Sequence, residues 1–253
     1  MNDTLKAHKL EFNYLISRKA NILLILLLPL ITISVLGLSM PTDFSVGYIE
    51  DTGSQEPTQD NVKFHEDGHL HILAYMFSVI ILFSAIQMGS LRVVAERAPY
   101  GTLDREILGI DRKSMIIGKF SANFIFALMQ SILILIIGVL WFNLNNPVEI
   151  LSVLIALAFF GVAYGILISV LVNTKDQALQ LVIISIGLFL ILTGFSYPIE
   201  NLEPLSENLP MTVSINLMDK IMLSGEYEFS GILKIMMAGI LSLSAAAFKF
   251  SSE

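Results

Sequence analysis

The stretch Arg92 to Lys119, RVVAERAPYGTLDREILGIDRKSMIIGK, holds six of the fifteen lysines and arginines of the chain. The long segments on either side of it are almost uncharged. A polar segment between two apolar ones is expected to lie in water rather than in hydrocarbon. Pro99 and Gly101 interrupt any helix that enters the stretch, and Thr102 is a suitable cap for a new helix. The sequence therefore predicts an aqueous loop with a short helix inside it.

The short helix is predicted over Thr102 to Ile110. Leu103, Ile107 and Ile110 fall on one helical face, at i, i+4 and i+7. Its first turn contains acidic residues, and negative charge is favourable there because it lies at the positive end of the helix dipole. This pattern indicates a small amphipathic helix that lies against another surface. From residue chemistry alone, an ordinary basic cytoplasmic loop explains the stretch equally well.

The composition is that of an integral membrane protein. Of 253 residues, 55% are hydrophobic and only 15% are charged, against about a quarter charged in soluble domains. The net charge of −7 and the lack of a basic stripe argue against a nucleic-acid partner. Because the chain has no cysteine, disulfides, thiolate metal sites and cysteine nucleophiles are excluded.

Six apolar stretches are each close to the roughly 20 residues needed to cross a bilayer. They are residues 21–40, 71–91, 116–140, 150–172, 179–197 and 231–248. An even number of spans places both termini on one side of the membrane. Residues 1–20 hold four lysines and arginines, the 92–119 stretch holds six, and Lys175 and Lys249 make twelve, whereas the other side has three. The positive-inside rule then predicts that both termini lie in the cytoplasm.

Residues 1–20 are expected to form a helix at the membrane interface rather than a cleaved signal peptide. One helical face gathers four apolar side chains, those of Leu5, Phe12, Leu15 and Ile16. Basic residues accompany them, among them Lys9 and Arg18.

The first outer segment, residues 41–70, is polar and acidic. Phe44 to Ile49 alternates weakly and predicts a short strand. The segment ends in three histidines within seven residues, His65, His69 and His71. Such donors suit Zn²⁺ or Cu²⁺, and the i, i+2 spacing of the last two suits a strand or loop. A solvated loop without metal is the simpler interpretation, and it is the one we adopt.

The segment from Ser196 to Ser230 is too long for a simple turn. Pro198, Pro204 and Pro210 break it. Met211 to Leu223 predicts an amphipathic helix that is too short to span a bilayer. From residue chemistry alone, the segment is an outer loop that lies on the membrane surface.

Several kinds of chemistry are missing from the predicted spans. Gradient-driven transporters need an ionisable centre near the middle of the membrane, and no Asp, Glu, Arg or His occupies that position. No paired carboxylates, zinc-binding helix or serine with a base occurs there, so no catalytic residue is predicted. No Gly-rich phosphate-binding loop of the G-x-x-x-x-G-K-[ST] kind is present. The polar residues inside the spans are expected to hydrogen-bond between helices: Ser78, Ser84, Gln87, Asn123, Gln130, Ser131, Tyr164, Ser185 and Thr193.

The order Glu96-Arg97, Gly101-Thr102-Leu103 and Gly118-Lys119 resembles the cytoplasmic loop of ABC-2 type transporter permeases. In that family the corresponding segment forms a coupling helix that docks on a separate ATPase subunit. The resemblance therefore implies a docking element made of Glu96, Arg97, Gly101, Thr102, Leu103 and Glu106. A supporting interfacial helix would include Lys9, Phe12 and Arg18.

A second segment resembles the same family. It is the outer segment before the last span, with Gly194, Tyr197, Pro198, Glu200 and Pro204. In the family, re-entrant helices at this place cap the outer end of the pathway. The chain departs from the pattern at Asn216-Leu217, where the family more often has Asn-Pro, so the local geometry stays open.

The resemblance implies an all-α fold of six membrane helices in one transmembrane domain over residues 1–253. The chain would be a permease subunit in the cell membrane, paired with an identical or different permease and with ABC ATPase subunits. ATP and magnesium would bind the ATPase, and this chain would need no cofactor or metal. Export of a drug, lipid or other amphiphile is the first expectation, and sodium or metal-related cargo is the second. A channel or carrier, and a non-transport immunity or sensor-anchoring protein, are the rival classes.

Overall fold

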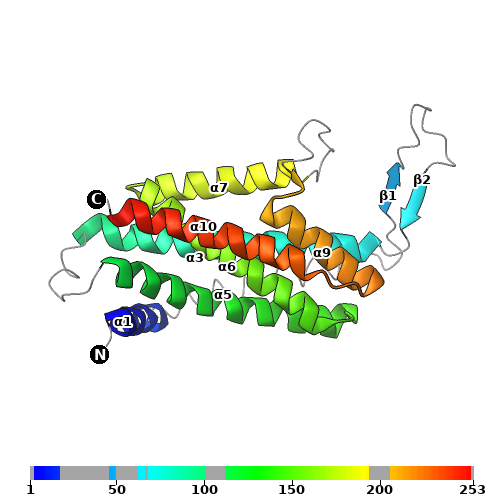
Figure 1. Ribbon diagram of the computed structural model, residues 1–253, viewed down its shortest axis with the longest axis horizontal. Helices are drawn as coiled ribbons and strands as arrows, with labels where there is room; N and C mark the ends of the chain where they lie inside the picture. The colour runs from blue at the N-terminus through cyan, green and yellow to red at the C-terminus, as the bar shows by residue number, and fades with distance from the viewer. Residues whose placement is uncertain are drawn as a thin grey trace.

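The computed structural model describes residues 3–17, 46–49, 62–65, 68–100, 112–193 and 206–251. These residues form seven helices and one antiparallel pair of strands (Figure 1). The elements are α1 (Asp3–Ser17), β1 (Val46–Ile49), β2 (Val62–His65), α3 (Gly68–Tyr100), α5 (Arg112–Phe142), α6 (Pro147–Leu171), α7 (Lys175–Leu192), α9 (Pro210–Ser224) and α10 (Phe229–Ser251).

Five of the described helices contain a segment long and apolar enough to cross a membrane: Leu70–Leu91, Ser114–Phe142, Pro147–Leu171, Lys175–Leu192 and Phe229–Lys249. They correspond to five of the six predicted spans. The first predicted span, residues 21–40, lies outside the described residues. The chain is therefore a multi-pass membrane protein, while the sixth span and the orientation stay predictions.

The long helices run side by side, so the bundle has two ends (Figure 1). We call one the α1 end: it contains α1, the last turns of α3, the first turn of α5, the α6–α7 turn and the C-terminal end of α10. The other, the α9 end, contains α9, the α5–α6 turn and the β1–β2 pair. The marked N- and C-terminal ends both lie at the α1 end. The prediction that all basic segments share one side of the membrane stays a prediction.

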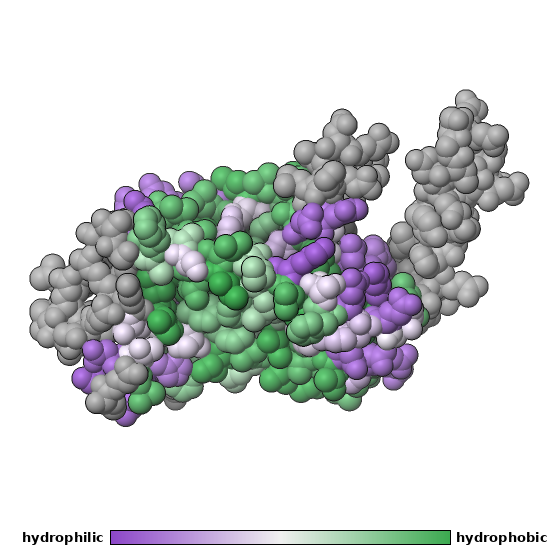
Figure 2. Space-filling view, viewed as in Figure 1, coloured by the Kyte–Doolittle hydropathy of each residue, from purple (hydrophilic) through white to green (hydrophobic). Residues whose placement is uncertain are grey.

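Hydropathy along the bundle follows the same division (Figure 2). A broad apolar surface covers the middle of the visible face, and hydrophilic residues gather toward both ends. Helices α7 and α10 have only 28% of their most apolar window buried within the chain. Their remaining apolar surface faces outward, as expected of helices that meet lipid or another membrane subunit.

Helix α6 is the central element of the core. Its apolar window is 78% buried, which suits a helix that is hydrophobic on all sides. Two glycines let α3 approach it closely. A Cβ on Gly89 would lie 2.5 Å from the carbonyl oxygen of Val162, and a Cβ on Gly165 would meet the carbonyl oxygen of Ile86. Because both obstacles are backbone atoms, no side-chain movement would relieve the clash.

Two helices extend beyond the predicted spans. Helix α3 continues to Tyr100, nine residues past the expected end of its span. Helix α7 begins at Lys175, four residues early, because Thr174 caps it by accepting a hydrogen bond from the Gln177 backbone at 3.3 Å. The described helix ends at Leu192, and residues 194–197 of the predicted span lie outside the described residues.

The outer segment adds a small sheet to the otherwise helical fold. The predicted strand over Phe44–Ile49 is confirmed for Val46–Ile49, which pairs antiparallel with β2, with Val46 opposite His65. The sequence reading did not predict β2. His69 and His71 stand in the first turn of α3, so the prediction that they lie in a strand or loop is wrong.

Candidate functional site

Helix α1 lies across the end of α5 rather than along the bundle; Figure 1 shows it nearly end-on, whereas the long helices run across the view. The crossing point is built from two small residues. Ala7 is 3% exposed, and a Cβ placed on Gly118 would lie 2.7 Å from the Ala7 Cβ. The missing side chain on Gly118 therefore lets the two backbones approach closely.

Polar contacts flank this crossing on both sides. The hydroxyl groups of Thr4 and Ser114 lie 3.3 Å apart. Ser121 donates its hydroxyl proton to the carbonyl of Gly118 at 3.0 Å, so its oxygen accepts from Nδ1–H of His8 at 2.7 Å. These bonds fix the position of α1 along α5.

An aromatic contact secures the far end of the α1 interface. Phe12 stacks on His8 with a ring-centroid distance of 5.9 Å and meets Phe126 at 6.0 Å. Phe12 also packs against a small buried cluster that includes Met88 of α3 and Ala122 of α5. Helix α1 is thus connected to both helices that enclose the 101–111 segment.

The face of α1 that packs on the bundle only partly overlaps the apolar face that the sequence indicates. Thr4, Ala7, His8 and Phe12 face the bundle, whereas Leu5 is 57% exposed. Of the apolar residues on the predicted interfacial face, Phe12 packs on the bundle and Leu5 does not. The small Ala7, not the larger Leu5, fits against Gly118. Lys9 is exposed, and Arg18 lies outside the described residues.

The beginning of the Arg92–Lys119 stretch is also less aqueous than predicted. Val93 is 7% exposed and Val94 is fully buried. Val94 packs with Val172 and Ala178 from the α6–α7 turn and the start of α7. These contacts stabilise the part of α3 that continues beyond the membrane span. Glu96 and Arg97 stand in this extension, whereas Gly101, Thr102, Leu103 and Glu106 lie outside the described residues.

At the α9 end, α3 presents a stripe of polar side chains at i, i+4 and i+7. His71 donates from Nδ1 to Oδ2 of Asp219 at 2.5 Å. The next two positions pair hydroxyl groups at 2.9 Å, Tyr75 with Thr193 and Ser78 with Ser214. The stripe therefore joins α3 to α9 and to the residue that follows α7.

The comparisons with known proteins agree with this architecture. Residues 13–223 match the family model described as ABC-2 type transporter. The chain belongs to the ABC-2 type transporter family. The match covers most of the chain and includes the end of α1, all of α3, α5, α6 and α7, and nearly all of α9. The family assignment predicted from the two resembling segments is thereby confirmed.

A curated relative supports this ABC-2 assignment. The chain is 30% identical over 161 residues to "ABC transporter G family member 20" of Dictyostelium discoideum. The alignment covers 59% of this chain and 22% of the relative. The chain therefore spans about a fifth of the length of the relative that it matches.

The predicted short helix before the last span of this ABC-2 protein is confirmed. Helix α9 (Pro210–Ser224) buries Met211, Ile215 and Met218 on one face. Pro210 starts the helix, and Gly225 ends it with a φ of 71° that suits glycine. The residues that resemble the family pattern upstream, Gly194, Tyr197, Pro198, Glu200 and Pro204, lie outside the described residues.

Several of the polar residues within the spans pair between helices as predicted, whereas Asn123 donates within its own helix to the carbonyl of Lys119. Ser84 of α3 donates to Oε1 of Gln130 of α5 at 2.6 Å. The hydroxyls of Tyr164 in α6 and Ser185 in α7 lie 3.1 Å apart. Ser131 instead donates within its own helix, to the carbonyl of Ala127. In the described part of the chain, no group of three histidine or acidic side chains is arranged to hold a metal ion.

Proposed function

We propose that this chain is the permease subunit of an ATP-binding cassette exporter whose ATP is hydrolysed on a separate chain. The family match over residues 13–223 is the observation that carries the proposal. The printed sequence contains no Gly-rich phosphate-binding loop, so the proposed ATP site lies outside these 253 residues. ATP and magnesium accordingly belong to the partner, and this chain needs no cofactor or metal of its own.

The α1 end is the proposed docking surface for that partner. The stretch 101–111 connects α3 to α5, and α1 packs on both of these helices through Phe12 and its cluster. A force on the Thr102–Ile110 segment would therefore reach α3 and α5 through the chain and α1 through side-chain contacts. Glu96, Arg97, Gly101, Thr102, Leu103 and Glu106 are the proposed docking residues, with Lys9, Phe12 and Arg18 in the supporting helix.

An amphiphile, such as a drug or lipid, is the proposed cargo. The described spans carry no charged residue at their middle, so they offer no binding centre for a small ion. A pathway for an apolar molecule would lie between two permeases in the cell membrane. The outward apolar surfaces of α7 and α10 provide area for a second permease, identical or different, as well as for lipid.

Co-purification of the solubilised chain from its native membrane tests the proposal. We compare wild type with a Glu96→Ala/Leu103→Asp variant. The matched control is Leu223→Asp/Glu226→Ala, which makes the same two substitutions among exposed residues of the α9 end. Wild type and the control are expected to recover an ATPase with a Walker motif, and the coupling variant is expected to lose it.

Two other results would contradict the proposal. If wild type recovers no ATPase under gentle conditions, the proposal of an ATP-driven transporter is wrong. Equal recovery by all three proteins would place the docking surface elsewhere. In proteoliposomes, the reconstituted pair is expected to transport only with ATP, whereas a channel or carrier would be active as this chain alone.

A further inference from the structure

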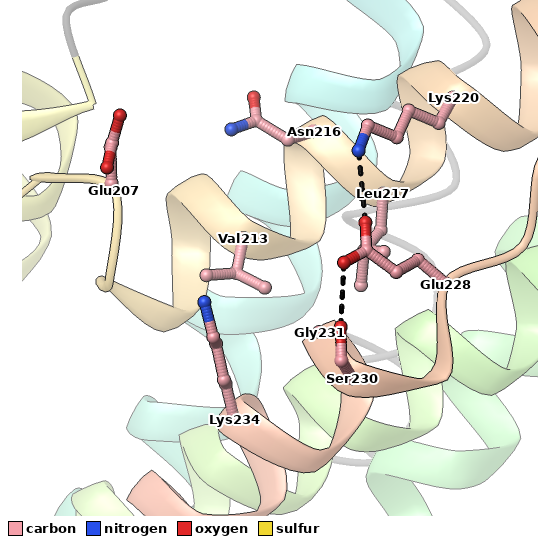
Figure 3. A pocket seen from close by; sticks show the side chains of 9 residues that line it. All are labelled: Glu207, Val213, Asn216, Leu217, Lys220, Glu228, Ser230, Gly231 and Lys234. Carbon is pink, nitrogen blue, oxygen red and sulfur yellow. Dashed lines mark hydrogen bonds and ion pairs between the residues drawn. The ribbon is translucent and has the colours of Figure 1, made fainter.

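The α9 end contains a small open recess of about 130 Å³ between α9 and the start of α10 (Figure 3). Four charged side chains border it: Glu207 ahead of α9, Lys220 on α9, Glu228 before α10 and Lys234 on α10. Val213 and Leu217 form an apolar part of its wall. The predicted family features do not include this recess.

One pair of opposite charges in the recess is already satisfied. Lys220 Nζ donates to Glu228 Oε2 at 3.0 Å, and Ser230 donates its hydroxyl proton to Glu228 Oε1 at 2.7 Å. Both bonds are drawn in Figure 3. Each oxygen of Glu228 therefore has a partner, and the charge of Lys220 is compensated.

The other two charges, Glu207 and Lys234, make no direct ion pair, although Lys234 helps to lower the pKa of Glu228. Among the described residues, no carboxylate forms an ion pair with the ammonium group of Lys234, and none of their basic groups pairs with Glu207. Figure 3 shows Lys234 reaching toward Val213 and Glu207 apart from it, ahead of α9. A cation and an anion that border one recess can each form a charge-assisted hydrogen bond with a ligand that carries both charges.

The position of Lys234 indicates where such a ligand comes from. Lys234 is exposed and stands inside the apolar segment Phe229–Lys249, five residues from its start, or about 7.5 Å along the helix axis. Its neighbours Phe229, Leu233 and Met237 are 62%, 52% and 52% exposed. A long basic side chain at this depth extends toward the lipid headgroups, next to a surface that acyl chains can cover.

We propose that this recess binds the phosphoethanolamine headgroup of a membrane phospholipid. The phosphate binds the ammonium group of Lys234, the lipid's own ammonium group faces Glu207, and the acyl chains lie on the exposed apolar face of α10. This site does not depend on the ATPase or on the direction of transport, so its failure would leave the proposed function intact.

Lipid titration of the purified, delipidated full chain, followed by native mass spectrometry, tests the site. The probes are phosphatidylethanolamine and phosphatidylglycerol with identical acyl chains. Lys234→Gln is expected to weaken the binding of both lipids about tenfold, because one charge-assisted hydrogen bond is lost. Lys234→Arg keeps the positive charge and is expected to bind both lipids with the affinity of wild type. Glu207→Gln is expected to weaken phosphatidylethanolamine alone, because phosphatidylglycerol has no ammonium group.

Lys175→Gln is the matched control, since Lys175 is an exposed lysine at the α1 end. Thermal unfolding of every variant checks that the fold is kept. The proposal is overturned if Lys234→Gln binds both lipids as wild type does, or if Lys175→Gln loses as much affinity. Competition by soluble O-phosphoethanolamine at lipid-like concentrations would overturn a lipid site in favour of a site for free phosphate esters.

Discussion

Ala7 and Gly118 meet where α1 crosses α5, and a Cβ on Gly118 would lie 2.7 Å from that of Ala7. No larger pair of residues allows the same crossing. Thr4 and His8 on α1 make their polar contacts with Ser114 and Ser121, one turn on either side of Gly118. The position of the N-terminal helix is therefore determined by a steric fit and two hydrogen bonds together.

A disulfide can test the position of α1 directly. The chain has no native cysteine, so a Thr4→Cys/Ser114→Cys variant carries a single possible pair. Because the two hydroxyl oxygens lie 3.3 Å apart, mild oxidation is expected to join the cysteines in most molecules. A gel shift of a chain cut between α1 and α5 measures the yield. A Leu5→Cys/Ser114→Cys control is expected to stay reduced, because Leu5 is 57% exposed.

Enlarging Gly118 should displace α1. In the same double-cysteine chain, Gly118→Val is expected to reduce the disulfide yield and to destabilise the protein by about 1–3 kcal/mol, the usual cost of overpacking. Gly187→Val is the matched control, because a Cβ on Gly187 of α7 meets nothing within 4 Å. An unchanged disulfide yield in the Gly118→Val chain would show that α1 does not pack as described.

The contact between α3 and α6 should tolerate a larger side chain even less than the contact between α1 and α5 does. Gly165→Val is expected to lower the free energy of unfolding by about 2 kcal/mol or more, because its Cβ would meet the backbone oxygen of Ile86. Thermal unfolding in detergent, compared again with Gly187→Val, measures the difference. Equal midpoints for the two variants would refute the close approach of the helices.

The bond between His71 and Asp219 is expected to hold α9 to α3. Asp219 is only 16% exposed and its Oδ1 is buried without a partner in the described part of the chain. A double-mutant cycle with His71→Ala and Asp219→Ala should give a coupling of about 1 kcal/mol. The same cycle on Lys220 and Glu228, both more than half exposed, should give no measurable coupling. Similar coupling energies for the two pairs would contradict the expectation that the less exposed pair contributes more to stability.

Acid should weaken the hydrogen bonds that Glu228 accepts, with little effect on overall stability because Glu228 is exposed. The hydroxyl of Ser230, and then the ammonium group of Lys220, hold the pKa of Glu228 below its ordinary value. Since the folded pKa is lowered, the contribution of these bonds is complete above the unfolded pKa and is lost as the pH falls through the folded pKa. Ser230→Ala is expected to raise the pKa of Glu228, as measured by NMR titration of its carboxyl carbon. An unchanged pKa would mean that the Ser230 bond is absent in solution.

Apolar segments were predicted well because their length alone decides whether they can cross a bilayer. The five described spans and the helix over Met211–Leu223 appear where the sequence indicated. Pro210 and Gly225 mark the limits of that short helix, so local chemistry was sufficient there.

Features that depend on a distant partner were missed. Val93 and Val94 stand between charged residues, and only the burial of both and the contacts of Val94 with Val172 and Ala178 show that α3 continues past the span. The packed face of α1 depends on Gly118, more than a hundred residues away, which selects Ala7 over Leu5. Likewise, β2 forms because β1 pairs with it. The recess at Lys234 needs α9 and α10 to be side by side, which no local pattern reveals.

The continuity of α3 has a mechanical consequence. The helix has 33 residues from Gly68 to Tyr100, so it is about 50 Å long. It carries the His71–Asp219 bond near one tip and the turn with Glu96 near the other. A tilt of about 5° around its midpoint would move each tip by about 2 Å in opposite directions. Because α3 is one continuous helix, a displacement of about 2 Å at the α1 end would be matched by a similar displacement at the α9 end. A movement of that size is large enough to break a hydrogen bond there.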